Sequence, residues 1–335
     1  MANRFWVGGT GTWNTTNTAN WSATSNGAGG ASAPVAGDAV VLDANSGTGT
    51  ITLGANVPCF LLTMGNYAGT LDFNNFAINI GGNNATVFSG GPNYTLAGTP
   101  NLNFTYSGSV GTRTMSSGAS ASLNSTLNYN VTAGTDIIIA SSFRSINFTG
   151  FSGTFNNTAR VVFGDMTFSA TMTVAAGANT TTFSRASGTQ TITTNGKTLD
   201  FPLAFNGANT VFVFQDALTQ GSTRNFTLTN GTVQLKNGVT STVGNFITSG
   251  TARKFLQSTV AGSQATLSEA AGTVNASYLT IQDINATGGA TWNAYVDQFN
   301  VDAGNVDGWD FGISPVVGGA EYTYQLRSFT EPRRF

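Results

Sequence analysis

The sequence predicts an all-β protein whose strands are wound into a parallel β-helix, also called a β-solenoid. Three observations favour this fold. Short β-branched and aromatic runs recur, glycine and asparagine separate them, and no window of about ten residues shows the 3.6-residue period of a helix. Charged residues make up only 8% of the chain, against about 25% in ordinary soluble domains. Such a composition suits strands that neighbouring turns of a solenoid cover.

The expected strands and turns alternate at short spacing. Apolar or alternating runs predict strands at residues 50–53, 70–73, 101–104, 161–163, 211–214 and 226–228. Four asparagines precede a glycine and predict tight turns, because both residue types tolerate a positive φ: Asn195, Asn206, Asn230 and Asn237. Residues 193–201 and 228–235 share a strand, Asn-Gly, strand pattern. Their separation of about 35 residues is typical of a structural repeat.

The alternative all-β architecture is a series of β-sandwiches. Sandwiches joined in series predict clear hairpin pairs, and a linker where the composition changes. The chain shows neither feature between residues 47 and 290. The parallel β-helix is therefore the preferred prediction, with serial β-sandwiches as the alternative.

Tryptophan is confined to the two ends of the chain. Trp6, Trp13 and Trp21 lie near the start and Trp292 and Trp309 near the finish. Open solenoid ends expose apolar surface and unpaired strand edges, so these residues predict aromatic end caps. The alternative is that the indole rings stack on the sugar rings of a cell-surface glycan.

Three segments follow from this distribution. Residues 1–46 are expected to form an N-terminal aromatic cap with some strand, residues 47–290 the solenoid body, and residues 291–335 a C-terminal cap and attachment tail. The tail follows Gly318 and Gly319, and it concentrates arginines and aromatic residues on a chain otherwise poor in charge. These are the residue types enriched at binding hot spots. The expected attachment residues are Tyr322, Tyr324, Arg327, Phe329, Arg333, Arg334 and Phe335.

The residue inventory excludes several kinds of catalytic site. With no histidine and one cysteine, the chain has no Ser-His-Asp triad, no Cys-His pair and no ordinary zinc site. We therefore expect no catalytic residues, no metal and no cofactor. Paired carboxylates for glycoside hydrolysis stay as an alternative, and the candidates are Asp136, Asp165, Asp200, Asp216, Glu269 and Asp283. A calcium site is a further alternative, formed by Asp297, Asp302, Asp307 and Asp310.

Cysteine content and charge limit the expected partners. Cys59 lies in an apolar stretch with no cationic neighbour, which predicts a buried thiol and not a nucleophile. The net charge of -2 predicts neither a nucleic-acid groove nor a polybasic membrane patch. No apolar run approaches the length of about 20 residues that spans a bilayer. The N-terminus shows no signal-peptide pattern, so we expect synthesis in a cytoplasm.

Several segments resemble β-helical surface proteins. The opening residues 4–14, 20–22 and 38–41, together with Pro34, look like the start of such proteins. They are similar to the strand repeats of bacterial autotransporters and, more closely, to virion surface proteins of tailed bacteriophages. Residues 145–155 and 326–331 also look phage-like. The expected absence of a signal peptide departs from autotransporters and favours the phage proteins.

The resemblance implies a non-enzymatic structural protein of the virion, assembled in the host cytoplasm. Its expected role is that of a tail spike or tail fibre component in host adsorption. A capsid decoration or cement protein is the first alternative, and a glycan-cleaving tail spike is the second. The expected partners are two further copies of the chain in a homotrimer, other virion proteins and a host-surface glycan. Neither nucleic acid nor membrane insertion is expected.

Overall fold

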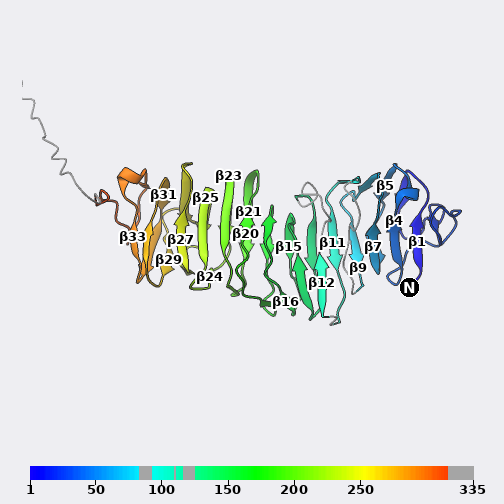
Figure 1. Ribbon diagram of the computed structural model, residues 1–335, viewed down its shortest axis with the longest axis horizontal. Coiled ribbons are helices and arrows are strands. Elements are labelled where there is room, and N and C mark those ends of the chain that lie inside the picture. The colour runs from blue at the N-terminus through cyan, green and yellow to red at the C-terminus, as the bar shows by residue number, and fades with distance from the viewer. Residues whose placement is uncertain (83–92, 109–110, 116–124, 316–335) are drawn as a thin grey trace, which may run out of the picture.

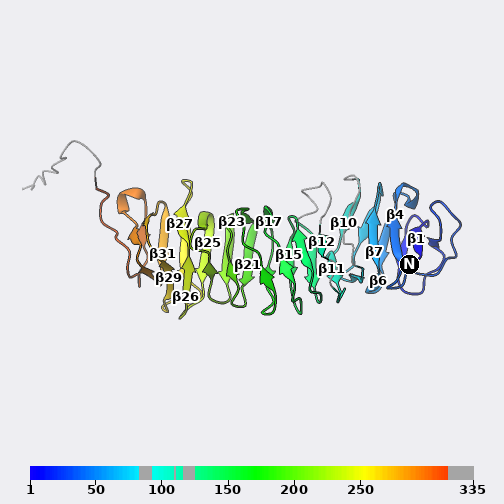
Figure 2. The same ribbon diagram turned by 60° about the horizontal axis from the view of Figure 1, so that its bottom comes forward.

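The computed structural model is a slender rod of stacked β-strands (Figures 1 and 2). It describes residues 1–82, 93–108, 111–115 and 125–315. The strands run across the long axis and form a parallel β-solenoid of about 11 turns, with the N-terminus at one end. The two short helices in the described ranges are 3-10 helices, Ala44–Ser46 and Val296–Gln298. The predicted parallel β-helix is confirmed, and the serial β-sandwich alternative is set aside.

One long sheet runs along most of the rod. Each of its main strands pairs in parallel with the equivalent strand of the turns before and after it. This arrangement is what the repeated strand pattern predicts for a solenoid. In spatial order the main strands are β6 (Val57–Cys59), β9 (Ala77–Ile80), β11 (Asn101–Phe104), β13 (Asn128–Val131), β15 (Ser145–Asn147), β18 (Met166–Thr167), β21 (Ser187–Thr193), β23 (Leu203–Phe214), β25 (Asn225–Leu235), β28 (Lys254–Ser258), β31 (Leu279–Gln282) and β34 (Val301–Asp302). Three further strands extend it sideways: β17 (Arg160–Val162), β20 (Thr181–Phe183) and β27 (Asn245–Thr248).

Shorter sheets form the other faces. Near the N-terminus these are β3 (Trp21–Ser22), β1 (Asn3–Trp6), β4 (Ala39–Leu42) and β7 (Leu61–Met64), and β10 (Thr95–Ala97), β8 (Thr70–Asp72), β5 (Thr50–Leu53) and β2 (Gly11–Trp13). Further along are β12 (Thr112–Met115), β14 (Ile137–Ala140), β16 (Thr154–Phe155) and β19 (Thr173–Val174). The last two sheets are β22 (Thr198–Leu199), β24 (Thr219–Gln220), β26 (Thr240–Val243), β29 (Ala265–Glu269) and β32 (Ile284–Gly288), then β30 (Thr273–Asn275) and β33 (Thr291–Asn293).

The N-terminal strands belong to the same stack as the body. Strand β1 pairs in parallel with β4, which pairs in parallel with β7, so sheet pairing joins residues 1–46 to the turns that follow. The pairing of β1 with β3 is the one antiparallel strand pair within the described residues. Because β3 folds back antiparallel against β1, the first turn of the solenoid ends in a different strand edge from the later turns. Open solenoid ends need such an irregular segment.

The core is a continuous column of side chains. Alternate residues of each strand point inward, and equal positions of neighbouring turns lie about 4.8 Å apart. Phenylalanine rings stack in this way through the second half of the rod. Ring centroids are 5.2 Å apart for Phe183 and Phe205, 4.8 Å for Phe205 and Phe226, and 5.8 Å for Phe226 and Phe246. Aromatic pairs in such arrangements contribute stabilising free energy beyond that of their buried area.

Two of the four predicted Asn-Gly turns are wrong. Asn195, with φ 48°, and the glycine that follows form a turn as predicted, and Asn237 also lies in a turn. Asn206 and Asn230, in contrast, lie inside the long strands β23 and β25. The pairing register of these strands shifts around Asn206. These two Asn-Gly dipeptides therefore lie at a bulge, where a continuous strand bends. Bulges are another place where a sheet uses glycine.

A charged pair lies inside the core of the middle turns. Arg113 on β12 and Asp136, which precedes β14, have fully buried side chains. The guanidinium Nη2 donates to Asp136 Oδ1 at 2.8 Å, and Nε donates to the second carboxylate oxygen. This side-on arrangement pairs the two charges across neighbouring turns, while Arg113 Nη1 is buried without a hydrogen-bond partner among the described residues. Within the described ranges, no helix has the length and apolar character needed to cross a membrane.

We predict that Asp136→Asn strongly destabilises the protein. The substitution preserves shape but leaves the Arg113 charge buried without a counter-charge, which costs about 3–5 kcal/mol. Urea denaturation followed by far-UV circular dichroism measures the loss. Asp302→Asn is the matched control, because Asp302 is exposed and Asn can also accept its bond from the Gly304 N–H. Equal urea midpoints for the two variants would contradict the prediction.

Candidate binding surfaces

The three N-terminal tryptophans form one packed cluster. Trp6, Trp13 and Trp21 come from β1, β2 and β3 and are fully buried. Their rings meet edge to face, with centroids 5.1 Å apart for Trp6 and Trp21 and 5.3 Å for Trp13 and Trp21. Trp6 Nε1 also donates to the Gly9 carbonyl oxygen at 2.8 Å. Their faces are covered by protein, which fits a packing role and leaves no face for a sugar ring.

The two C-terminal tryptophans lie at the opposite end of the rod. The ring centroids of Trp292 and Trp309 are 4.9 Å apart, and both rings contact Phe246, the last member of the phenylalanine column. Trp292 is buried and Trp309 is half-buried. An aromatic cluster therefore closes each end of the core.

The predicted attachment residues lie outside the described residues. They are Tyr322, Tyr324, Arg327, Phe329, Arg333, Arg334 and Phe335. The last described residue is Pro315, and strand β33 lies near the end of the rod opposite the N-terminus (Figure 1).

Each of the six candidate catalytic carboxylates has a structural partner. Asp136 pairs with Arg113, and Asp200 pairs with Arg224 at 2.7 Å. The others accept bonds that fix turns or neighbouring rungs: Asp165 from the Thr191 N–H, Asp216 from the Thr194 and Asn195 N–H groups, Glu269 from the Phe246 N–H, and Asp283 from the Gly262 N–H and Asn305 Nδ2. Such bonds are the ordinary duty of carboxylates at turns.

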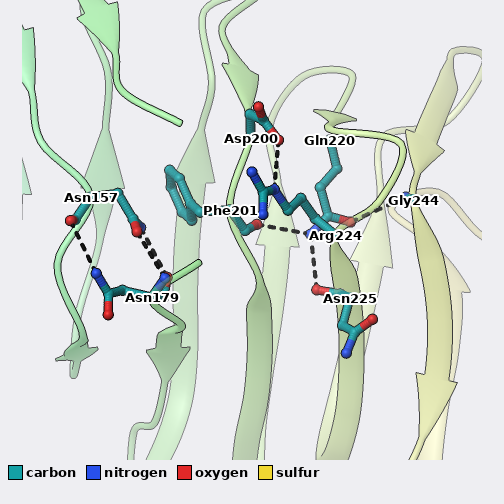
Figure 3. Close-up of polar contacts among 8 residues, drawn as sticks. All are labelled: Asn157, Asn179, Asp200, Phe201, Gln220, Arg224, Asn225 and Gly244. Carbon is teal, nitrogen blue, oxygen red and sulfur yellow. Dashed lines mark hydrogen bonds and ion pairs between the residues drawn. The ribbon is translucent and has the colours of Figure 1, made fainter. Parts of the chain in front are cut away.

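The corners near Asp200 are held by buried amides (Figure 3). Gln220 Nε2 donates to the carbonyl oxygens of Phe201 and Asn225 at 3.1 and 2.9 Å, while its Oε1 accepts from the Gly244 N–H at 3.4 Å. One side chain therefore links three successive turns. Because the chain itself satisfies these polar atoms, the cluster stabilises corners and is not an open site.

A neighbouring corner uses the same device. The Asn157 side chain accepts from the Asn179 N–H and donates to the Asn179 carbonyl oxygen, both at 2.9 Å (Figure 3). The primary amide thus imitates a strand partner, with one donor and one acceptor. It joins two turns at a place where no strand is formed.

The four aspartates weighed as calcium ligands have different partners. Asp297 accepts from Ser314, Asp302 from the Gly304 N–H, Asp307 from Gln264 Nε2 and Asp310 from the Gly312 N–H. Within the described part of the chain, no three His, Cys, Asp or Glu side chains converge to hold a metal ion.

Columns of amide side chains lie on the outer face of the long sheet at strands β9, β11 and β13. Asn79, Asn103 and Asn130 are register partners, and the Nδ2 groups of Asn103 and Asn130 donate to the Oδ1 of the preceding turn, at 2.8 and 2.9 Å. Asn101 and Asn128 form a second column, joined at 3.1 Å. Asparagine stacking suits the ladders of a β-helix, and the alternation of asparagine with apolar residues in β11 and β13 is the sequence signal for these columns.

A pocket lies beside the C-terminal aromatic cluster. Its volume is about 460 Å³, and its described walls carry amides, hydroxyls and one aromatic ring but no charged side chain. This is the chemistry that recognises a neutral sugar, where a ring stacks on the sugar and amides bond its hydroxyls. The lining residues are Asn275, Ala276, Ser277, Asn293, Tyr295, Gln298, Ser314 and Pro315.

Comparisons with known proteins identify no relative of this chain. No family of proteins, no curated protein and no solved structure matches this chain.

Cys59 is fully buried on β6, and burial raises the pKa of its thiol to about 12. We predict that the native protein does not react with iodoacetamide at pH 8. The thiolate is the reactive form of cysteine, and the core accommodates neither the thiolate nor the reagent. Mass spectrometry after alkylation, with urea-unfolded protein as the control, checks this.

The raised pKa of Cys59 also makes the stability of the fold decrease as the pH rises from 9.0 towards about 12, since in that range only the unfolded chain loses the thiol proton.

Proposed function

We propose that the protein is a non-enzymatic structural component of a tailed-bacteriophage virion, assembled in the host cytoplasm, and that it acts in host adsorption as part of a tail spike or fibre. One observation carries the proposal. The described residues form a single long rod with neutral amide columns on part of one face and a sugar-compatible pocket at one end. Such a rod can reach from a particle and present polar groups to a surface.

The rival roles receive less support from the same observations. A glycan-cleaving spike needs two carboxylates that are free to flank one bond, yet all six candidates bind local partners. A capsid cement protein needs a broad footprint on the capsid lattice, which a slender rod offers only along its side. The resemblance of residues 4–14 to virion surface proteins supports both virion roles equally.

The proposed assembly is a homotrimer or a larger symmetric array. The long flanks of the rod carry few charges, and charged residues are what normally keep protein surfaces apart. Ile137 on β14 is exposed, and Ile139 beside it is partly exposed. Sheet flanks of this kind associate readily with copies of themselves. Besides copies of the chain and other virion proteins, the proposed partner is a host-surface glycan, which the sugar-compatible pocket would bind.

We predict that particles labelled with an antibody against this protein carry the label on the tail. Electron microscopy of negatively stained virions provides the measurement. The purified protein is also expected to compete with virions for host cells and to slow their adsorption, with heat-unfolded protein as the control. Label distributed over the head would contradict adsorption and favour the cement role. Shortened envelope polysaccharide after incubation would favour the enzyme.

We further predict that the tail is the attachment peptide. Deleting residues 320–335 removes Arg327, Arg333 and Arg334 with the neighbouring aromatic side chains, but none of the described solenoid. The truncated protein is therefore expected to keep the β-type circular dichroism spectrum and the urea midpoint of the full chain, yet to be missing from purified particles. Immunoblotting of particles measures incorporation. Incorporation at the normal copy number would instead direct attention to the end that contains Trp6.

A further inference from the structure

A second pocket opens halfway along the rod and differs from the first in charge. Its volume is about 490 Å³, and it is lined by Ser125, Arg144, Phe163, Ser184, Arg185 and Ala186. Two guanidinium groups, an aromatic ring and two hydroxyls therefore share one cavity. Among the described residues, no carboxylate belongs to the lining.

The fold builds this pocket by stacking three turns. Phe143 pairs with Val162, and Val162 pairs with Phe183. The residues that follow each of them, Arg144, Phe163 and Ser184, therefore occupy equivalent places on successive turns, about 4.8 Å apart. All three lie at a corner, where β17 gives way to β18 and β20 gives way to β21. On the next turn the corner is filled, because β23 runs through the bend without a break.

The two arginines are positioned but not neutralised. The methylene stem of Arg144 lies against Gly164, where an added Cβ would come within 3.1 Å of Arg144 Cγ. Arg185 Nη1 donates to the Thr189 carbonyl oxygen at 2.6 Å. That bond leaves Nε and Nη2 of Arg185 to form a side-on fork for another acceptor.

No ion pair within the described ranges involves Arg144 or Arg185. The ion pairs within the described ranges are Arg4 with Asp38, Arg113 with Asp136, and Arg224 with Asp200. The Asp165 carboxylate, two residues along the chain from Phe163, accepts the Thr191 N–H at 2.7 Å and is not among the residues that line the pocket. Two like charges held in one cavity repel each other, and an anion placed between them removes that cost and gains charge-assisted hydrogen bonds.

The surroundings favour an extended ligand over a free ion. Beyond Ser184 the same column continues through Asn206, which follows Phe205, the partner of Phe183. Asn206 Oδ1 accepts from Asn230 Nδ2 of the next turn at 2.6 Å. A track of hydroxyl and amide groups thus leads away from the arginines along the rod, matching the hydroxyl groups of successive sugar units.

We propose that this corner binds an acidic polysaccharide, with Arg144 and Arg185 on a carboxylate, sulfate or phosphate group and Phe163 against the adjoining sugar ring. Guanidinium forks match the planar or tetrahedral oxygens of these groups. The aromatic ring supplies an apolar face for the sugar. Any use of this site in adsorption rests on the proposed function, whereas the ligand chemistry does not.

The test uses the purified full chain and three oligosaccharide probes of similar length: oligogalacturonate, a sulfated dextran fragment and unmodified dextran. Isothermal titration calorimetry at low and physiological salt measures binding. We expect the wild-type protein to bind an acidic probe, more tightly at low salt, and to bind dextran far more weakly. Preference for oligogalacturonate identifies a carboxylate ligand, and preference for the sulfated probe identifies a sulfate or phosphate.

The variant Arg144→Gln/Arg185→Gln is expected to lose affinity for the acidic probe by about tenfold or more, because each charged hydrogen bond contributes at least that factor. Lys236→Gln/Arg253→Gln is the matched control, since it removes two positive charges away from the pocket. If the double variant does not fold, the single variants Arg144→Gln and Arg185→Gln replace it. Wild-type protein that binds neither acidic probe, or pocket variants that bind like the control, would overturn the site. Neither result alters the labelling test of the virion role.

Discussion

The whole structure depends on vertical register, the requirement that each residue lie above an equivalent residue of the turn below. At a spacing of about 4.8 Å, like charges on neighbouring turns repel strongly in the interior. Aromatic rings and primary amides meet the requirement best. Rings stack face to face, as Phe183 and Phe205 do, and an amide both donates and accepts, as Asn103 does between Asn79 and Asn130. The scarcity of charged residues follows from this geometry.

Charged residues in the core bond to groups of their own turn and of neighbouring turns. Arg160 has no carboxylate partner; its guanidinium donates to the carbonyl oxygens of Ala140 and Asn156 and lies 4.2 Å from the Phe155 ring centroid. Burial lowers the pKa of Arg160 to about 9. Lys254 similarly donates to two carbonyl oxygens, and burial lowers the pKa of its ammonium group. Because each of these groups occupies a single turn, no charge faces its like.

The sequence predicted those features that depend on neighbours along the chain. Runs such as residues 101–104 form strands as expected, and the tryptophans do cluster at the two ends. Features that depend on contacts between turns were missed. Asn206 reads as a turn in isolation, but pairing with β25 keeps it in a strand. Arg144 and Arg185 are far apart in sequence, and only the register of β17 and β20 brings them into one cavity.

The direction of the strands also determines how the rod carries mechanical load. Because the strands cross the long axis (Figure 1), their ladder hydrogen bonds lie along it. End-to-end tension therefore loads the turns in series, and the interface with the fewest bonds yields first. Strands β16, β18 and β19 have two residues each and lie together near the middle of the rod. Each of these short strands offers fewer ladder bonds to share the load than β23 and β25, which have 12 and 11 residues.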